Sequence, residues 1–120
     1  MSAITRMQTR PRMSAINIYN NTVYLAGQTG GSEGGIKEQA QNMLAKVDAL
    51  LAEAGSSRKH MLSAAVYLKD MKDFAAFNEV WDAWVPQGET PGRACVQASM
   101  NSPAVLCEVV VIAALAGKDA

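Results

Sequence analysis

Apolar residues recur at helical spacing in two segments of the chain. In residues 35–54 they occupy one side of a helical projection: Ile36, Ala40, Met43, Leu44, Val47, Leu50, Leu51 and Ala54. This spacing predicts an amphipathic helix, and Gly55 directly after it is typical of a C-terminal cap. Residues 71–85 carry aromatic side chains at the same spacing: Phe74, Phe77, Trp81 and Trp84. We interpret this second stripe as core packing against a sheet.

Shorter β-rich runs alternate with these helices. Residues 15–19 and 22–26 flank Asn20-Asn21, which predicts a hairpin because Asn tolerates left-handed backbone angles. Further strands are predicted at 62–68, 93–99 and 105–114, with a turn at 101–103. Residues 1–12 look irregular. The stretch "GQTGGSEGG" at 27–35 lacks the Lys-Ser/Thr of a P-loop, so we interpret it as a loop leading into the helix.

The element order ββαβαββ predicts an α+β fold in which one mixed sheet has two helices on one face. A chain of 120 residues suggests a single domain, 1–120. The run "AVLCEVVVIAALA" at 104–116 is apolar almost throughout, which predicts burial on both faces. A self-associating sheet, and hence a homo-oligomer, would cover the second face. The alternative is that the loop and the N-terminal arm fold back over it.

The composition of the chain limits the classes of function and the cellular location that we expect. The 11 basic and 11 acidic residues balance, so no global field favours nucleic acid or an anionic membrane. No segment has the pattern of a membrane span or a signal peptide, and we expect a cytoplasmic protein. A Cys95–Cys107 disulfide is geometrically possible, but a reducing cytosol disfavours it. These cysteines and His60 do not make a standard zinc site, so no metal is expected. We interpret His60 as a surface or hinge residue without partners.

Two charged residues, Arg93 and Glu108, fall inside predicted strands. An antiparallel hairpin turning near residues 100 and 101 would place them opposite each other, and two interpretations stay open. They form a structural cross-strand ion pair, or they act on a ligand. In the second case Arg93 would bind a substrate carboxylate and Glu108 would move protons. The small neighbours Gly92, Ala94 and Cys95 would leave room for such a ligand.

Several segments, in order, resemble a known family: "VYLAGQTG", "AAVYLKDMKDFAAFNEVWDAW", "PGRACVQA" and "CEVVVIA". From about residue 14 to 115 the chain resembles the Rid (YjgF-type) family of enamine/imine deaminases, in a branch diverged from the archetype. The resemblance implies a chorismate-mutase-like fold and a homotrimer whose sheets line a central barrel, with clefts between subunits. It also implies hydrolysis of reactive imino acids, such as 2-aminoacrylate, to 2-keto acids and ammonia without a cofactor.

The same resemblance implies roles for individual residues. Arg93 would bind the substrate carboxylate, the backbone at Cys95 would help to place water, Glu108 would be the acid, and Asn78 would lie near the cleft. Two substrate-site positions depart from the archetype. Met13 stands where it has a tyrosine, and Ala26 stands where it has a serine before Gly27-Gln28. Both changes remove hydroxyls, which leaves the substrate open.

Three functions follow from these observations. The first is an imine hydrolase acting on a small imino acid, with a keto acid as its product. The second is a non-catalytic, regulatory trimer that binds a small carboxylate in the same cleft. The third, a ribonuclease or translation inhibitor, is disfavoured by the neutral charge and by the lack of a basic strip studded with aromatic residues. We therefore expect neither nucleic acid nor a membrane as a partner.

Overall fold

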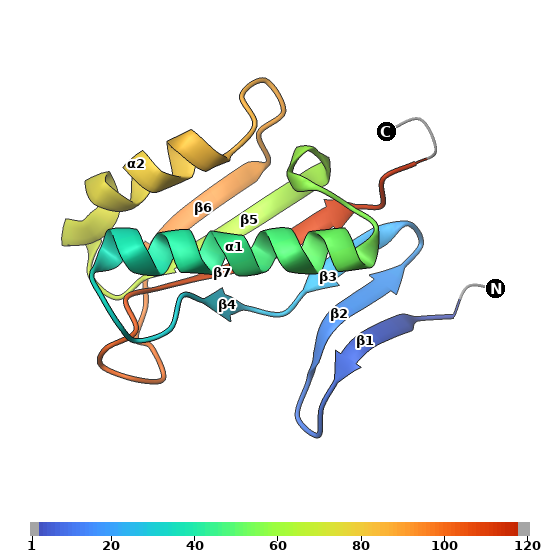
Figure 1. Cartoon of the computed structure of the whole chain (residues 1–120), viewed down its shortest axis with the longest axis horizontal. Helices are drawn as coiled ribbons and strands as arrows, with labels where there is room; N and C mark the ends of the chain where they lie inside the picture. Colours follow the sequence, from blue (N-terminus) through green and yellow to red (C-terminus); the bar gives the residue numbers. More distant parts are fainter. Residues whose placement is uncertain (1–2, 118–120) are drawn as a thin grey trace.

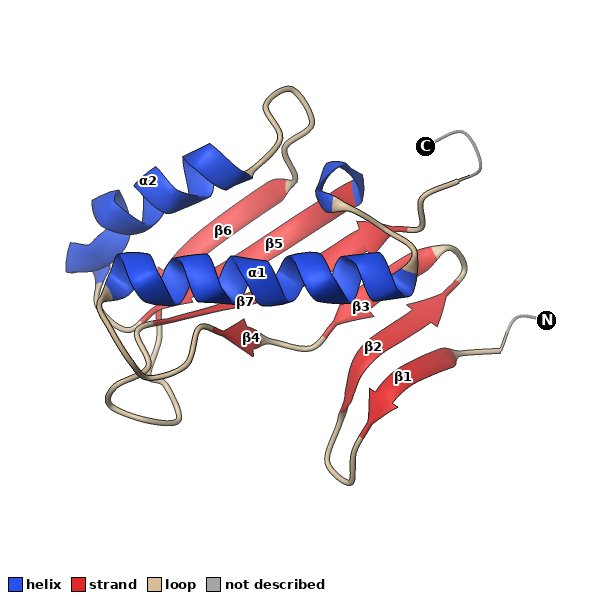
Figure 2. Ribbon diagram, in the orientation of Figure 1, coloured by secondary structure: helices blue, strands red, loops and turns tan. Residues whose placement is uncertain are grey.

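One seven-stranded sheet carries both helices on the same face, as the computed structural model of residues 3–117 shows (Figures 1 and 2). The strand order is β1-β2-β3-β7-β5-β6, and the short β4 also pairs with β7. The strands are β1 Thr5–Thr9, β2 Ser14–Tyr19, β3 Thr22–Leu25, β4 Gln28–Thr29, β5 Met61–Leu68, β6 Gly92–Gln97 and β7 Cys107–Ala114. The helices are α1 Ile36–Ala54 and α2 Phe74–Trp84. A 3-10 turn, η1 Arg58–His60, follows α1, and another, η2 Met71–Asp73, directly precedes α2. The predicted α+β fold is confirmed.

The local signals that predicted these elements act as expected. Gly55 ends α1 in the left-handed conformation at φ 84°, which costs glycine little. Asn20 and Asn21 have φ values of 51° and 63°, as a two-residue hairpin turn between β2 and β3 requires. The core lies between the sheet and the helices. Phe77 and Trp81 of the aromatic stripe are buried in it, as predicted, but Phe74 is exposed, so the stripe is only partly core.

Two strands were missed in the sequence. The segment predicted as irregular contains β1, which pairs antiparallel with β2 along the sheet edge. Its burial pattern explains the miss, because only Met7 is even half-buried and no apolar alternation marks the strand. The Gly-rich loop contains β4, whose two residues pair with β7. Neither strand carries a hydrophobic alternation, and β1 is held by backbone pairing together with the side-chain hydrogen bonds Arg6–Asn17 and Thr9–Ser14.

The predicted hairpin between the last two strands is wrong. β6 runs parallel to β5, and β5 lies between β6 and β7. The reason is the connection through α2, since a strand–helix–strand crossover returns the chain parallel to its first strand. The thiols of Cys95 and Cys107 are therefore two strand spacings apart, about 10 Å. A disulfide between them, which the hairpin would have allowed, is excluded by this geometry, and both cysteines are free.

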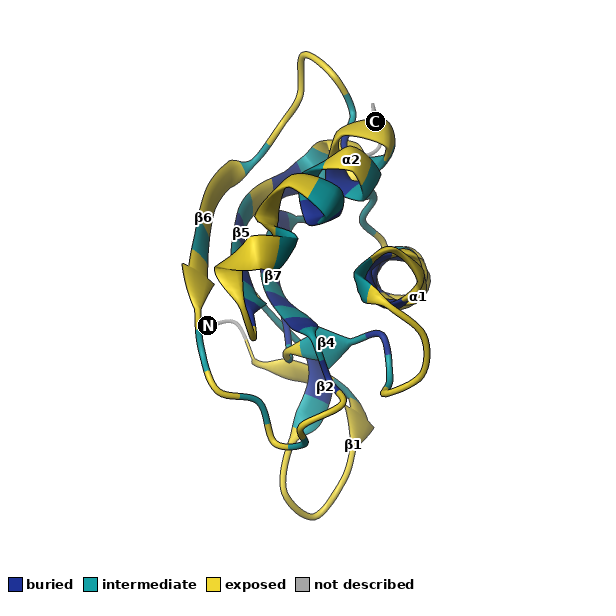
Figure 3. Cartoon of the chain, turned by 90° about the vertical axis from the view of Figure 1, so that its left-hand side faces the viewer, coloured by how far each residue is buried: buried dark blue, intermediate teal, exposed yellow. Residues whose placement is uncertain are grey.

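Strand β7 leaves one face incompletely covered within a single chain, as the sequence analysis expected. Its residues alternate between buried and half-buried, so within one chain only the face toward the helices is fully covered. The helix-free face carries Glu108 and Val110 on β7, and exposed side chains at Tyr24 and Val96 on β3 and β6. Figure 3 shows both helices on one side of the sheet and the exposed strand β6 at its edge. The homotrimer that would cover this face stays a prediction.

Candidate functional site

Arg93 lies on the exposed edge strand β6, and its side chain is held on the helical face of the sheet. It is in register with Ala64, a core residue of β5. Its Nη1 donates a hydrogen bond to Oδ1 of Asn78 on α2 at 2.8 Å. Its guanidinium carbon lies 5.4 Å from the ring centre of Trp81 and 6.0 Å from that of Phe74. One amide and two aromatic rings therefore orient an arginine that is not buried, contrary to the prediction.

The charge of Arg93 is not neutralised by a carboxylate. The ion pairs of residues 3–117 join Lys37 to Glu79 and Arg58 to Asp48, and neither involves Arg93. The hydrogen bond to Asn78 uses one donor of the guanidinium group, which leaves its remaining donors for a planar anion. This arrangement suits the binding of a ligand carboxylate.

Cys95 follows two residues later on the same face and is half-buried. Burial raises the pKa of its thiol, while the positive charge of Arg93 acts in the opposite direction. The thiol is therefore protonated at neutral pH and is a poor nucleophile. The role of the Cys95 backbone in placing water, which the family resemblance implies, stays a prediction.

Glu108 lies on the opposite, helix-free face of the sheet. It is in register with Tyr67 on β5 and with Thr29 on β4. Gly27 gives its carboxylate room, because a methyl group there would lie 3.2 Å from Cδ of Glu108 and would overlap Oε2. A pocket of about 320 Å³ opens beside the carboxylate, lined by Tyr67, Ala98, Ser99, Met100, Glu108 and Val110.

Of the remaining predicted residues, Ala26 and Gly27 lie beside Glu108, and Met13 lies toward α1. Ala26 precedes Gly27 and is tied to β2 by a hydrogen bond from its N–H to the carbonyl of Ala15, 2.9 Å. Met13, in the turn between β1 and β2, lines a hollow of about 440 Å³ together with Gly27. The structure thus brings Ala26, Gly27 and Glu108 into one neighbourhood, whereas the hollow at Met13 is also lined by Lys46 and Leu50 of α1 and does not include Glu108.

The predicted Arg93–Glu108 pair does not exist within one chain. Their register partners on β5, Ala64 and Tyr67, are an odd number of residues apart, so the two side chains point to opposite faces. The physical reason is again the parallel β5–β6 pairing. The site residues accordingly form two groups. The arginine group is Arg93, Asn78 and Cys95, and the glutamate group is Glu108 with Gly27 and Ala26, while Met13 lies outside both.

Gln39 is a site-supporting residue that the sequence analysis missed. It is a fully buried polar residue on the apolar side of α1. Its Nε2 donates to the carbonyls of Gly34 at 3.2 Å and Ala104 at 2.9 Å, and its Oε1 accepts from the N–H of Leu106 at 2.9 Å. These bonds fasten the Gly-rich loop to the segment that enters β7 and so position Glu108. Its place between Ile36 and Met43 on the apolar face was the available signal.

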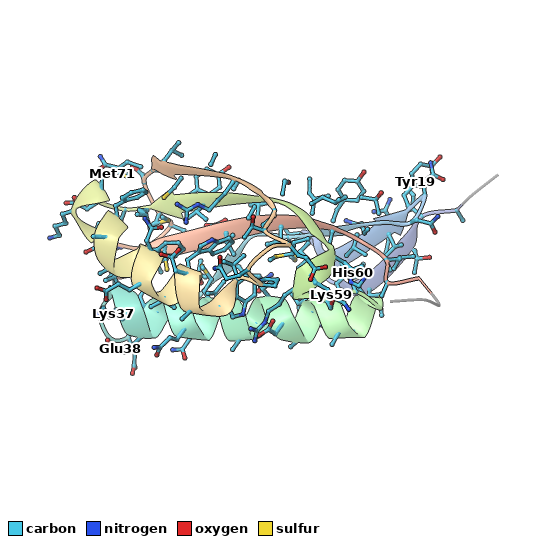
Figure 4. All side chains as sticks on the ribbon, turned by 90° about the horizontal axis from the view of Figure 1, so that it is seen from above. Tyr19, Lys37, Glu38, Lys59, His60 and Met71 are labelled. Carbon is cyan, nitrogen blue, oxygen red and sulfur yellow. The ribbon has the colours of Figure 1, made fainter. Side chains whose placement is uncertain are left out.

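Other candidate chemistry lies away from both groups. His60 has a partner, contrary to expectation, since its Nδ1 lies 2.7 Å from the hydroxyl of Ser57. Figure 4 shows His60 and Lys59 toward one end of the helical layer and Met71 and Lys37 at the other. Within residues 3–117 no three or more His, Cys, Asp and Glu side chains gather where they could hold a metal ion. No helix in the same residues is long and apolar enough to cross a membrane.

The chain is a two-layer α+β fold with one uncovered sheet face and an oriented arginine that no carboxylate neutralises within residues 3–117. Comparison with known proteins gives the family. The family model described as "Endoribonuclease L-PSP" matches residues 4–115. The RutC family protein YoaB of Escherichia coli (strain K12) is 39% identical over 112 residues, which cover 93% of this chain and 98% of the relative.

Solved structures agree with this assignment. NMB1025 of Neisseria meningitidis, a member of the YjgF protein family, matches with a TM-score of 0.94 and 39% identity over 96% of this chain and 97% of its own. YyfA of Yersinia pestis, from the conserved Rid protein family, has a TM-score of 0.83 over 89% of this chain and 90% of its own. At 21% identity it shows the fold alone. The chain belongs to the YjgF/RutC family, which confirms the resemblance found in its sequence.

Proposed function

We propose that this protein is a hydrolytic deaminase of small reactive imino acids, which it converts to 2-keto acids and ammonia. The observation that carries the proposal is Arg93. Its guanidinium is oriented by Asn78 and Trp81, is accessible on an edge strand, and has no carboxylate partner among residues 3–117. A planar fork of this kind matches the carboxylate of an imino acid.

The chemistry requires few further groups. Water adds its oxygen to the imine carbon and gives up one proton, which passes to the nitrogen. The hydroxyl of the resulting carbinolamine then gives up the second proton to the nitrogen, a C=O bond forms, and the C–N bond breaks to release ammonia. Glu108 would carry these protons to the nitrogen. Holding the imine and the water in position would supply most of the acceleration, since imines also hydrolyse in water alone.

The proposal needs more than one copy of the chain, because Arg93 and Glu108 lie on opposite faces of the sheet. In a trimer, the exposed edge strand β6 of one subunit would face the glutamate group of the next. The cleft between them would then hold the carboxylate of the imine at Arg93 and its nitrogen near Glu108. The expectation of clefts between subunits, drawn from the family resemblance, is part of this proposal.

A second function is a trimer that binds a small carboxylate without turning it over. The observation that favours it is the lack of hydroxyls at Met13 and Ala26. The family model is described as an endoribonuclease, which suggests RNA as a substrate. The formal net charge of +0 does not favour RNA, because RNA binding depends on positive charge. Binding of a keto acid without any imine turnover would support the second function over the first.

The test is imine hydrolysis in solution. An amino-acid oxidase generates 2-imino acids, and semicarbazide traps those that survive. The wild-type protein should lower the trapped signal, and Arg93→Ala should remove this effect, since losing a charged partner costs about 2–5 kcal/mol in binding. Arg58→Ala is the matched control, because Arg58 also stacks on a tryptophan but is paired with Asp48 outside both groups. Near-wild-type turnover by Arg93→Ala would refute the proposal.

A further inference from the structure

Tyr67 is the neighbour of Glu108 across the β5–β7 ladder. The two residues are in direct register on antiparallel strands, which places their Cβ atoms about 5 Å apart on the same face. Both line the pocket of about 320 Å³ on the helix-free side of the sheet. The walls formed by Ala98, Met100 and Val110 are apolar, so the phenol and the carboxylate supply much of the polarity of the pocket.

Three hydroxyl groups surround Glu108, and they are not equivalent. Thr29 lies in register on the other side, but its Oγ1 is turned to the N–H of Gly31, 3.4 Å away. Ser99 belongs to the connection after β6 and is exposed, so water solvates its hydroxyl. Tyr67 is half-buried in β5, a strand paired on both sides, and is therefore the hydroxyl held most firmly beside the carboxylate.

The rest of the glutamate group offers no hydrogen-bonding side chain, since neither Ala26 nor Gly27 has a polar side chain. A reacting water molecule needs more than one partner if its lone pair is to point at an imine carbon. A carboxylate can only accept a hydrogen bond, whereas a phenol can both donate and accept. Tyr67 is the residue that completes this requirement within the pocket.

We propose that Tyr67 is a water-positioning residue of the deaminase reaction and acts together with Glu108. The inference rests on the proposed function. The phenol and the carboxylate would hold one water molecule between them. Its oxygen would bond to the imine carbon, and both of its protons would pass in turn through Glu108 to the nitrogen, so that a C=O bond forms, the C–N bond breaks and ammonia leaves. Tyr67 keeps its own proton throughout, so the reaction balances without any further reactant.

The test is Tyr67→Phe, which removes one oxygen atom and keeps the ring. We expect kcat for imine hydrolysis to fall by about 10-fold to 100-fold while KM changes by less than about 3-fold, because only the water loses a partner. Tyr24→Phe is the matched control. Tyr24 lies on the same face in register with Ile112, four residues along β7 from Glu108, and is exposed. It should keep wild-type kinetics.

Each outcome decides the proposal. A fall in kcat with Tyr67→Phe alone, and an unchanged thermal melt, would support it. In a Glu108→Gln background the same change should then add little, because both groups act on one water molecule. Equal kinetics for Tyr67→Phe and Tyr24→Phe in an active protein would overturn the inference and leave the proposed function intact. A wild-type protein without imine hydrolysis would overturn both.

Discussion

The substitution Gly27→Ala should displace the Glu108 carboxylate without destabilising the fold, and it therefore tests whether the position of this carboxylate matters for catalysis. The added methyl group would lie 3.2 Å from Cδ and 3.5 Å from Cγ of Glu108 and would overlap Oε2. The carboxylate would have to move by about 1 Å to restore ordinary contacts, and a displacement of that size at a reacting group costs about 100-fold in rate. We therefore expect kcat for imine hydrolysis to fall by about 100-fold.

The fold should tolerate this substitution. Gly27 is not among the residues with positive φ, so alanine is unstrained there, and the atoms that must yield are at the end of a flexible side chain. Alanine also restricts the unfolded chain, which stabilises a protein by about 0.4–1 kcal/mol. Gly30→Ala is the contrasting variant, because a methyl group there would overlap the backbone carbonyl of Gln39 and should unfold the protein.

The assay is steady-state imine hydrolysis beside a thermal melt. Gly27→Ala should melt near the wild-type temperature with a much lower kcat, and Gly30→Ala should not yield folded protein. In a Glu108→Gln background, Gly27→Ala should add little further loss, because the displaced carboxylate is already absent. Wild-type kinetics for a folded Gly27→Ala variant would refute the reasoning, since the carboxylate would then have no positional role.

Two further predictions concern stability. Gln39→Leu keeps the size of the side chain but leaves the N–H of Leu106 and the carbonyl of Ala104 unpaired, so the free energy of unfolding in urea should fall by about 2–4 kcal/mol. A loss below about 0.5 kcal/mol would contradict the role of Gln39. Burial, assisted by the charge of Asp73, raises the pKa of Cys107 to about 12 in the folded protein. The unfolded thiol ionises near pH 8.5, so stability should fall as pH rises from about 8.5 to 12, by up to about 1.4 kcal/mol per pH unit. Cys107→Ala should lack this contribution, and equal pH slopes for the two proteins would contradict it.

The sequence predicts the elements that carry strong periodicity or specific turn residues. The apolar face of α1, its Gly55 cap and the Asn20-Asn21 turn are all confirmed. The strands β1 and β4 were missed because neither carries a hydrophobic alternation. Local sequence patterns identify helices, strands and turns, but they do not identify which strands pair with each other.

The candidate site shows the same limit. Arg93 and Asn78, which the family resemblance names separately, are joined by a hydrogen bond of 2.8 Å. The predicted contact between Arg93 and Glu108 is wrong, because the prediction assumed that strands that follow each other in the sequence also pair in the sheet. The sequence places Tyr67 in a predicted strand but does not indicate which residue lies opposite it. Its place beside Glu108 depends on the β5–β7 register, which is a long-range property of the fold.

Subunit complementation tests the central claim, a deaminase site shared between two copies of the chain. Arg93→Ala and Glu108→Gln proteins, each inactive alone, are co-expressed and purified as mixed assemblies. In random mixed trimers about three quarters contain both kinds of chain, and each of these holds one intact site in three. Imine hydrolysis should therefore recover to about a quarter of the wild-type rate. Mixed trimers that contain both variants and still show no hydrolysis would contradict the shared site.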